Sequence, residues 1–179
     1  FARAVQIPRR IEDALDIIIK GETIPVDGGV GDGNRYCINI AAGGRITELT
    51  YEVPSKMKTM LGQLAYYLKA VEMAPSIKAT HMRIEYDDNV FEGEALMFLC
   101  ALTNSVGGFE KLAPDASIND GHFTLLILKK CSLAEMLKIV SDAVRGEHLE
   151  NPNLIYGKAK RVKVESDETV HINLDGEYG

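Results

Sequence analysis

The sequence lacks the features that mark several large classes of protein. Its 20 Lys and Arg residues are outnumbered by 26 Asp and Glu residues, and the net charge is −6. A general nucleic-acid-binding domain would instead show a basic excess. No apolar run reaches the roughly 18 residues that a transmembrane helix needs, and no secretory signal peptide is recognisable. We therefore expect a soluble globular protein without a nucleic-acid partner, which agrees with 46% hydrophobic and 26% charged residues.

Cysteine is scarce, and its spacing excludes the common cysteine motifs. The three cysteines are Cys37, Cys100 and Cys131, and no two of them form a CxxC pair. Each lies beside apolar residues, as buried reduced thiols do. Because disulfides are rare in the cytosol, unpaired buried thiols indicate a cytosolic protein.

Complete catalytic motifs are also missing. The histidines, His81, His122, His148 and His171, show no metal-ligand spacing, and no Ser/His/Asp arrangement can be identified. The run GGVGDGN at 28–34 is not a phosphate-binding loop, because no Lys-Ser pair follows it and the next segment has a strand pattern. The residues by themselves define no complete active site.

The secondary-structure pattern consists mainly of strands that follow one another as hairpins. We expect strands at 23–27, 35–40, 78–86, 89–103, 122–130, 154–156, 160–165 and 169–174. Helices are predicted at 9–20, at 55–72, and from the capping box Ser132–Glu135 to Gly146, and AAGG at 41–44 is interpreted as a turn. Hairpins rather than β-α-β units predict an α+β fold, mainly β, with a largely antiparallel sheet and a few attached helices.

One loop in the second half of the chain is rich in oxygen donors. Asp115, Ser117, Asn119 and Asp120 fall within six residues, and Gly121 follows them. Hard cations such as Mg²⁺ prefer carboxylate and carbonyl oxygens, so the loop is a candidate cation site, although its spacing is not that of an EF-hand. The alternative is a solvated turn, which Asp, Asn and Gly also favour.

The predicted helix at 55–72 has an apolar stripe and a basic face. The basic face carries Lys56, Lys58 and Lys69. A helix of this kind can lie on a membrane surface. The alternative is that the stripe packs into the core and the lysines are only solvated.

Two carboxylates near residue 179 flank a predicted bend. Gly176 interrupts a strand pattern between Asp175 and Glu177. If the bend opens on a cleft, Glu177 can act as a general base towards a hydroxyl, a role worth roughly 10²–10⁴ in rate. The alternative is a surface hairpin turn, for which Asp-Gly is a common pair.

Longer motifs resemble one family over essentially the whole chain. They are FARAVQIPR, RYCINIAAGG, YEVPSKMKTMLGQLAYYLK, TNSVGGFEKLAPDASINDG, RGEH and NLDGEYG. In this order and spacing they are similar to the bacterial soluble diacylglycerol kinases, which belong to a lipid kinase family that also contains sphingosine and ceramide kinases. The resemblance implies ATP- and Mg²⁺-dependent phosphorylation of the hydroxyl of diacylglycerol to phosphatidic acid, a step of phospholipid metabolism.

The resemblance also implies a division into domains. Members of this family have a nucleotide-binding domain followed by a β-sandwich that binds the lipid. Residues 1–20 are then the end of the first domain and a linker, and residues 21–179 form an antiparallel β-sandwich. The GGDGT motif that binds ATP in relatives is absent, so we expect no ATP-binding residues in this chain, a longer parent protein, and no activity from this part alone.

Individual residues receive roles from the same resemblance. Glu177 is the expected proton acceptor. Mg²⁺ is expected at Asp120 through its carboxylate, and at Ser117 and His122 through backbone carbonyls.

The resemblance favours membrane contact by the basic face at 55–72, because lysines near anionic lipid contribute about 1 kcal/mol each. It implies a cytoplasmic protein at the inner face of the membrane, and a homodimer. One alternative is a kinase of another lipid alcohol. Another is that this chain alone is a non-catalytic lipid- and metal-binding β-domain. An NAD kinase relative is disfavoured by the motifs.

Overall fold

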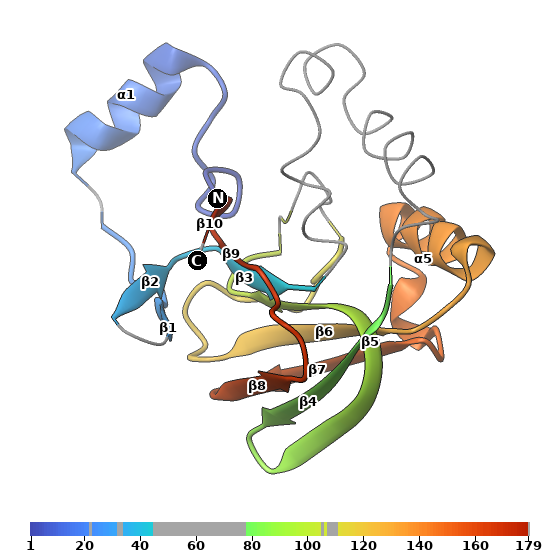
Figure 1. Cartoon of the computed structure of the whole chain (residues 1–179). Helices are drawn as coiled ribbons and strands as arrows, with labels where there is room; N and C mark the ends of the chain where they lie inside the picture. The colour runs from blue at the N-terminus through green and yellow to red at the C-terminus, as the bar shows by residue number, and fades with distance from the viewer. Residues whose placement is uncertain (22, 32–33, 45–77, 105, 107–110, 179) are drawn as a thin grey trace.

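A computed structural model of the chain describes residues 1–21, 23–31, 34–44, 78–104, 106 and 111–178 (Figure 1). Over these residues the expected α+β fold, mainly β, is confirmed, and the paired strands are antiparallel. The predicted helix at 55–72, with Lys56, Lys58 and Lys69, lies outside the described residues.

Among the described residues, eight strands form one sheet that folds into two layers, and two more form a separate hairpin. The hairpin is β1 (Gly29–Gly31) and β2 (Arg35–Cys37). The sheet contains β3 (Ile40–Gly43), β4 (Thr80–Tyr86), β5 (Asn89–Ala101), β6 (Phe123–Lys129), β7 (Leu154–Ala159), β8 (Val162–Ser166), β9 (Ile172–Leu174) and β10 (Glu177–Tyr178). One layer has the order β10-β9-β3-β5-β6-β7, and the other has the order β5-β4-β8.

Strand β5 belongs to both layers because it bends in the middle. Its first half pairs with β4 as far as Ala95, and its second half lies between β3 and β6 from Phe98 to Ala101. The register shifts between Ala95 and Met97. Such a bulge increases the local twist and redirects a strand. The curved green strand in Figure 1 therefore connects the two layers of the sandwich.

Strand β6 is buried on both of its faces. Leu125 and Ile127 pack in the core between the two layers, against side chains of β4 and β5. Leu126 and Leu128 point to the opposite face and pack in two further clusters. A strand covered on both sides has a continuous apolar sequence rather than an alternating one. The predicted strand at 122–130 is confirmed as β6.

Helix α5 (Leu133–Arg145) covers the outer face of this layer through Met136 and Ile139. The predicted capping box is confirmed. The Ser132 hydroxyl accepts a hydrogen bond from the Glu135 N–H at 3.3 Å, and the Glu135 carboxylate accepts one from the Ser132 N–H at 2.8 Å. These bonds satisfy donors that the first turn of a helix otherwise leaves unpaired.

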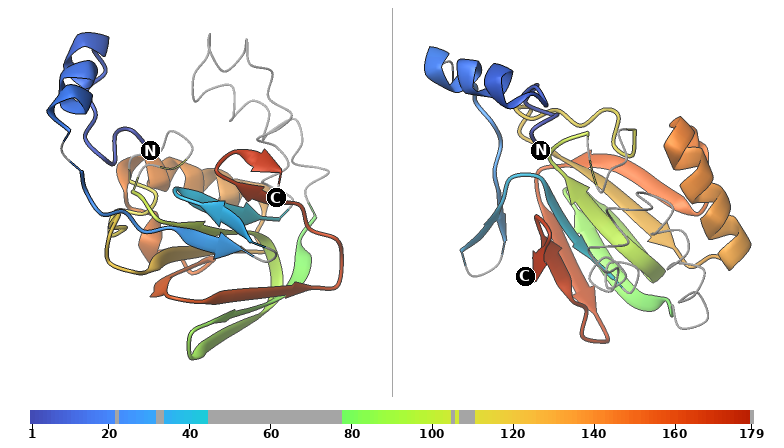
Figure 2. Two further views of the ribbon diagram at one scale, coloured as in Figure 1. Left: turned by 90° about the vertical axis from the view of Figure 1, so that its left-hand side faces the viewer. Right: turned by 90° about the horizontal axis from the view of Figure 1, so that it is seen from above.

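Helix α1 (Ile11–Lys20) confirms the first predicted helix, but it buries none of its residues in the described structure. Figures 1 and 2 show it apart from the sandwich. Its exposed apolar side chains are Ile11, Leu15, Ile18 and Ile19. In the part of the chain that the structure describes, no helix combines the length and the apolar character needed to cross a bilayer.

The interpretation of AAGG at 41–44 as a turn was wrong, because most of it is strand β3. The small residues there permit close packing instead of a turn. A Cβ atom on Gly43 would lie 2.5 Å from Cε1 of the Phe98 ring on β5.

The predicted strand at 23–27 was also wrong, since these residues form no strand. Asp27 makes isolated hydrogen bonds instead of a ladder. Its N–H donates to the Ile118 carbonyl at 2.6 Å, and its carboxylate accepts from the Gly121 N–H at 2.7 Å. Strand patterning cannot reveal such bonds, because both partners are in irregular segments.

We predict that Gly44→Ala destabilises the domain by about 2–4 kcal/mol. Gly44 has φ +115°, and an added Cβ would lie 2.5 Å from the Leu96 carbonyl oxygen and 2.6 Å from the Met97 Cα at the bend of β5. Urea unfolding followed by circular dichroism measures the change. Gly157→Ala is the matched control, because no atom lies within 4 Å of its Cβ position, and it should stay within about 0.5 kcal/mol of the wild type. Equal midpoints for the two variants would contradict the prediction.

Candidate functional site

The turn between β9 and β10 is held by one carboxylate. Asp175 accepts hydrogen bonds from the backbone N–H groups of Ile38, Asn39 and Ile40, at 2.8, 2.9 and 2.8 Å. Its own N–H donates to the Ile40 carbonyl at 3.0 Å. Successive N–H groups that converge on one anion form a strong anion-binding arrangement. The turn is therefore fixed to the segment between β2 and β3.

Further bonds define the conformation of this turn. Asp175 and Gly176 have φ of 53° and 102°, and the Gly176 N–H donates to the side-chain oxygen of the buried Asn173 at 2.8 Å. Glu177 follows at once, opposite Leu174 in the β9–β10 pair, and is exposed. The sequence predicted a bend between the two carboxylates, and the structure confirms it.

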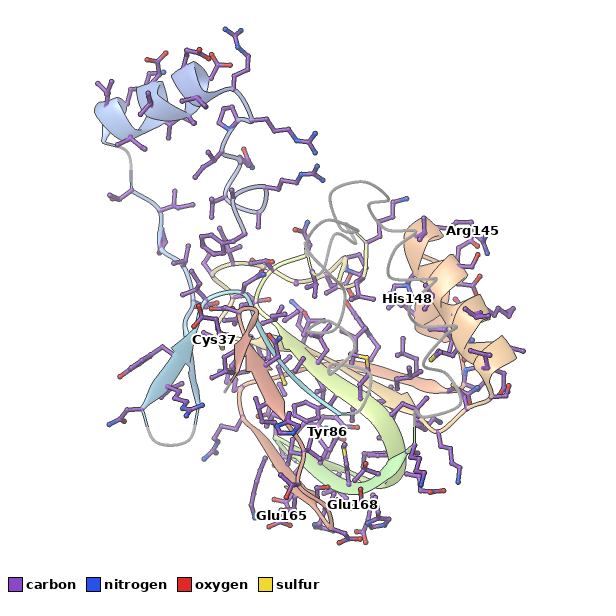
Figure 3. All side chains as sticks on the ribbon, turned by 45° about the horizontal axis from the view of Figure 1, so that its top comes forward. Cys37, Tyr86, Arg145, His148, Glu165 and Glu168 are labelled. Carbon is purple, nitrogen blue, oxygen red and sulfur yellow. The ribbon has the colours of Figure 1, made fainter. Side chains whose placement is uncertain are left out.

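A cavity of about 780 Å³ lies next to this turn. It is enclosed by the β1–β2 hairpin, β3 and β5, the start of β6, the end of β9, and the tips of the β4–β5 and β7–β8 hairpins. Its apolar side chains are Val30, Cys37, Ala41, Cys100, Phe123, Val162 and Leu174. Leu174 directly precedes Asp175, so one end of the cavity adjoins the terminal turn. Figure 3 shows Cys37 between the β1–β2 hairpin and the last strands.

The two thiols keep this part of the cavity uncharged. Burial raises the pKa of the Cys100 thiol to about 12. Burial and the nearby Asp175 carboxylate also raise the pKa of Cys37. Both thiols are therefore protonated at neutral pH, and the floor of the cavity is apolar.

The other end of the cavity has a charged rim. Its charged side chains are Glu85, Asp87, Asp88, Lys160, Arg161 and Lys163. The Asp87 carboxylate accepts from the Lys160 and Arg161 N–H groups at 3.0 and 2.9 Å, and these bonds lower the pKa of Asp87. The rim is thus a fixed link between the β4–β5 and β7–β8 turns. A cavity with an apolar floor and a charged rim suits an amphiphilic molecule.

The oxygen-rich loop (residues 113–122) leads into the same cavity, because Phe123 follows it and lines the wall. The Asp120 carboxylate accepts from the His122 N–H at 3.1 Å through Oδ1 and contacts the Lys158 ammonium through Oδ2. His122 Nδ1 lies 2.6 Å from the Asp120 carbonyl oxygen. The Ser117 hydroxyl donates to Asn119 at 3.3 Å. Ser117, Asp120 and His122 therefore lie in one compact loop.

The chemistry of this loop fits a hard cation. The Asp120 carboxylate and the backbone carbonyls are oxygen ligands of the kind that hard cations prefer. In this structure the Asp120 carboxylate already forms an ion pair with a cation, the Lys158 ammonium. Partial burial alone would raise the pKa of Asp120, but the Lys158 ammonium and the His122 N–H outweigh it and hold that pKa below its usual range. Among the described residues, no cluster of three or more His, Cys, Asp and Glu side chains is suited to a metal, so most ligands would be carbonyls or water.

Sequence patterns missed the residues that hold these parts together. Asp175 was noted only as one of two carboxylates that flank a predicted bend, whereas the structure shows that it accepts hydrogen bonds from backbone N–H groups. Lys158 and Asp27 carried no local signal, since each contacts a residue far away in the sequence. The predicted lysines of the membrane face lie outside the described residues.

Comparisons with known proteins place the chain among kinase sequences. Residues 43–179 match the family model described as the YegS C-terminal NAD kinase beta sandwich-like domain. The chain is 59% identical over 180 residues to a diacylglycerol kinase of Bacillus subtilis (strain 168), and 53% identical over 179 residues to one of Staphylococcus epidermidis (strain ATCC 12228 / FDA PCI 1200).

These alignments cover 100% of this chain but 59% and 56% of the relatives, so the chain spans little more than half of their length. A crystal structure of a candidate diacylglycerol kinase from Bacillus anthracis str. Sterne superposes with a TM-score of 0.77 at 25% identity. It covers 99% of this chain and 57% of that one.

We predict that Asp120→Asn destabilises the domain at pH 7 and that this difference disappears in acid. A carboxyl whose folded pKa is lowered contributes stability above its unfolded pKa, near 4, and loses it as the pH falls through the folded value. Urea midpoints at pH 7, 5 and 3, measured with EDTA present, test this. Asp88→Asn, on the exposed β4–β5 turn, is the control and should show no such trend. A constant difference between Asp120→Asn and the wild type at all three pH values would contradict the prediction.

Proposed function

Because the chain belongs to the family of the YegS C-terminal NAD kinase beta sandwich-like domain, we propose that its parent protein is a lipid kinase that phosphorylates diacylglycerol. In this proposal ATP is the phosphoryl donor and phosphatidic acid is the product. The names of the relatives support the reaction class. The observation that carries the proposal is the position of a cavity with an apolar floor directly beside the carboxylate turn.

The cavity suits the acyl part of a lipid alcohol. Its floor is apolar and its thiols are uncharged at neutral pH, so an acyl chain loses contact with water there without burying a charge. Leu174 at its end leads directly to the turn with Glu177. A lipid whose chain enters the cavity can thus present its hydroxyl near this carboxylate.

Glu177 is the proposed general base. As the hydroxyl oxygen of the lipid bonds to the γ-phosphorus of ATP, the bond from that phosphorus to ADP breaks, and the Glu177 carboxylate takes the hydroxyl proton. Phosphoryl transfer depends mainly on positioning, so the base has to be held in a fixed place. The hydrogen bonds of Asp175 supply this, because they fix the backbone two residues before Glu177.

Ser117, Asp120 and His122 would hold the Mg²⁺ ion of this proposal. The ion, when bound, supplies positive charge that neutralises Asp120 and draws backbone carbonyls together. The loop leads directly into Phe123 in the cavity wall, so its order affects the shape of the lipid site. Its proposed role is structural.

The division into domains is part of the same proposal. Residues 1–20 would belong to the end of a nucleotide-binding domain and a linker, and residues 21–179 to the lipid-binding β-sandwich. The exposed apolar face of α1 supports this division, since such a face normally packs against another element. The remaining length of the relatives is consistent with a further domain.

Further parts of the proposal concern partners and place of action. The substrate is a membrane lipid, so we place the parent enzyme in the cytoplasm, at the inner face of the membrane, with Lys56, Lys58 and Lys69 on the anionic surface. A homodimer is the proposed assembly. The second candidate substrate is another lipid alcohol, because an apolar cavity accepts many acyl chains.

We predict that Glu177→Gln lowers kcat of the full-length enzyme about a hundredfold or more, since glutamine keeps the shape but accepts no proton. Transfer of labelled γ-phosphate from Mg·ATP to diacylglycerol in mixed micelles measures this. Glu165→Gln, on exposed strand β8, is the matched control and should retain wild-type activity. Full activity of Glu177→Gln would remove Glu177 as the base. A folded, ATP-binding wild type without activity would redirect the search to other lipid alcohols.

Ala41→Leu should raise KM for long-chain diacylglycerol several-fold and leave kcat for a short-chain analogue nearly unchanged. Ala41 lines the cavity on β3, and the larger side chain occupies volume that an acyl chain would fill. Steady-state kinetics on both lipids separate the two effects. Ala134→Leu, at an exposed position of α5, is the control. Equal KM values for the long-chain lipid would exclude this cavity as the acyl site.

A further inference from the structure

In this structure the Asp120 carboxylate is paired with a cation of the protein itself, the Lys158 ammonium. The Lys158 ammonium contacts Oδ2 of Asp120, and the other oxygen accepts the His122 N–H at 3.1 Å. Both oxygens of the carboxylate are therefore in use. The side chain of Asp120 is 26% exposed and that of Lys158 is 39% exposed, so the contact is only partly screened by water.

The pairing of β6 with β7 positions Lys158 next to Asp120. Lys158 on β7 lies directly opposite Thr124 on β6. Thr124 is two residues beyond His122, so the lysine and the loop rise from adjacent positions of one sheet. The position of Lys158 therefore follows from the strand register.

A divalent cation on Oδ2 of Asp120 would lie next to the Lys158 ammonium, which already contacts this oxygen. Mg²⁺ binds oxygen at about 2.0–2.1 Å, so two positive charges would be close together in a partly buried position. They repel each other more strongly there than in bulk water. Binding of one cation therefore weakens binding of the other.

We propose that Lys158 competes with the divalent cation for the Asp120 carboxylate. This inference rests on the proposed metal-binding role of the loop. Without metal, Lys158 neutralises Asp120 and keeps the loop ordered. When the ion binds, the ammonium moves away into solvent, and the strength of the Lys158–Asp120 pair sets how much metal is needed. The Asp120 carboxylate thus has two alternative cations.

Binding of Mn²⁺, used as a paramagnetic probe, tests the proposal by electron paramagnetic resonance. The full-length protein is titrated without nucleotide at 0.15 M salt, where charges more than about 8 Å apart are largely screened. Mn²⁺ prefers the same oxygen ligands as Mg²⁺. The variants are Lys158→Gln, Lys158→Arg and Asp120→Asn. Lys160→Gln is the matched control, because it removes the same charge two residues away, on the tip of the β7–β8 hairpin.

Lys158→Gln is expected to lower the dissociation constant for Mn²⁺ about three- to tenfold, because it removes an ion pair of modest strength. Lys158→Arg and Lys160→Gln should bind like the wild type, and Asp120→Asn should lose the site. In thermal unfolding, Lys158→Gln should be less stable than the wild type without metal and equal to it at saturating Mn²⁺, since the ion replaces the lysine.

Equal Mn²⁺ affinity in the wild type and Lys158→Gln, with loss in Asp120→Asn, would keep the metal site and overturn the competition. Absence of Asp120-dependent binding in both proteins would overturn the competition together with the metal site. Neither outcome bears on the kinase reaction, which the Glu177 experiment tests separately.

Discussion

The arrangement of the candidate site depends on aspartates that accept backbone N–H groups from distant segments. Asp175 binds the residues between β2 and β3, Asp87 joins two hairpin turns, and Asp27 holds the oxygen-rich loop at Gly121. Each bond fixes one wall of the cavity relative to another. An ionised acceptor makes such bonds roughly twice as strong as neutral ones, so a few carboxylates contribute strongly to the relative positions of the walls.

Local patterns in the sequence predicted the elements whose residues interact with near neighbours. The capping box at Ser132, the helix at 9–20 and the strand at 122–130 were all visible, because each depends on periodicity or on residues a few positions apart. The largely antiparallel sheet followed from the order of the hairpins, and the sandwich from the family resemblance. The turn prediction for AAGG at 41–44 was wrong because Gly43 leaves room for the Phe98 ring, and only the folded sheet brings that ring close.

The site was predictable only in part, and the reason is again sequence distance. Glu177 and the oxygen donors of the loop were proposed from motifs. The hydrogen bonds of Asp175 and the Lys158–Asp120 contact, which position these residues, were not predicted. Asp175 accepts from residues more than 130 positions away, and Lys158 contacts a residue 38 positions away. Nothing in the local composition distinguishes these residues from ordinary surface charges. The cavity itself is lined by residues from eight strands, and so appears only with the complete topology.

The pairing of β3 with β9 has a consequence for how the domain forms. The hairpin of β4 and β5 joins residues that are close in sequence, whereas the β3–β9 pair joins Ala41 to Leu174. Contacts of such long range close a large loop and are formed slowly. During synthesis, the middle strands can pair while the chain is still being extended. The last wall of the cavity forms only after β9 has been synthesised. A nascent chain interrupted before β9 would therefore contain much of the core and an incomplete cavity.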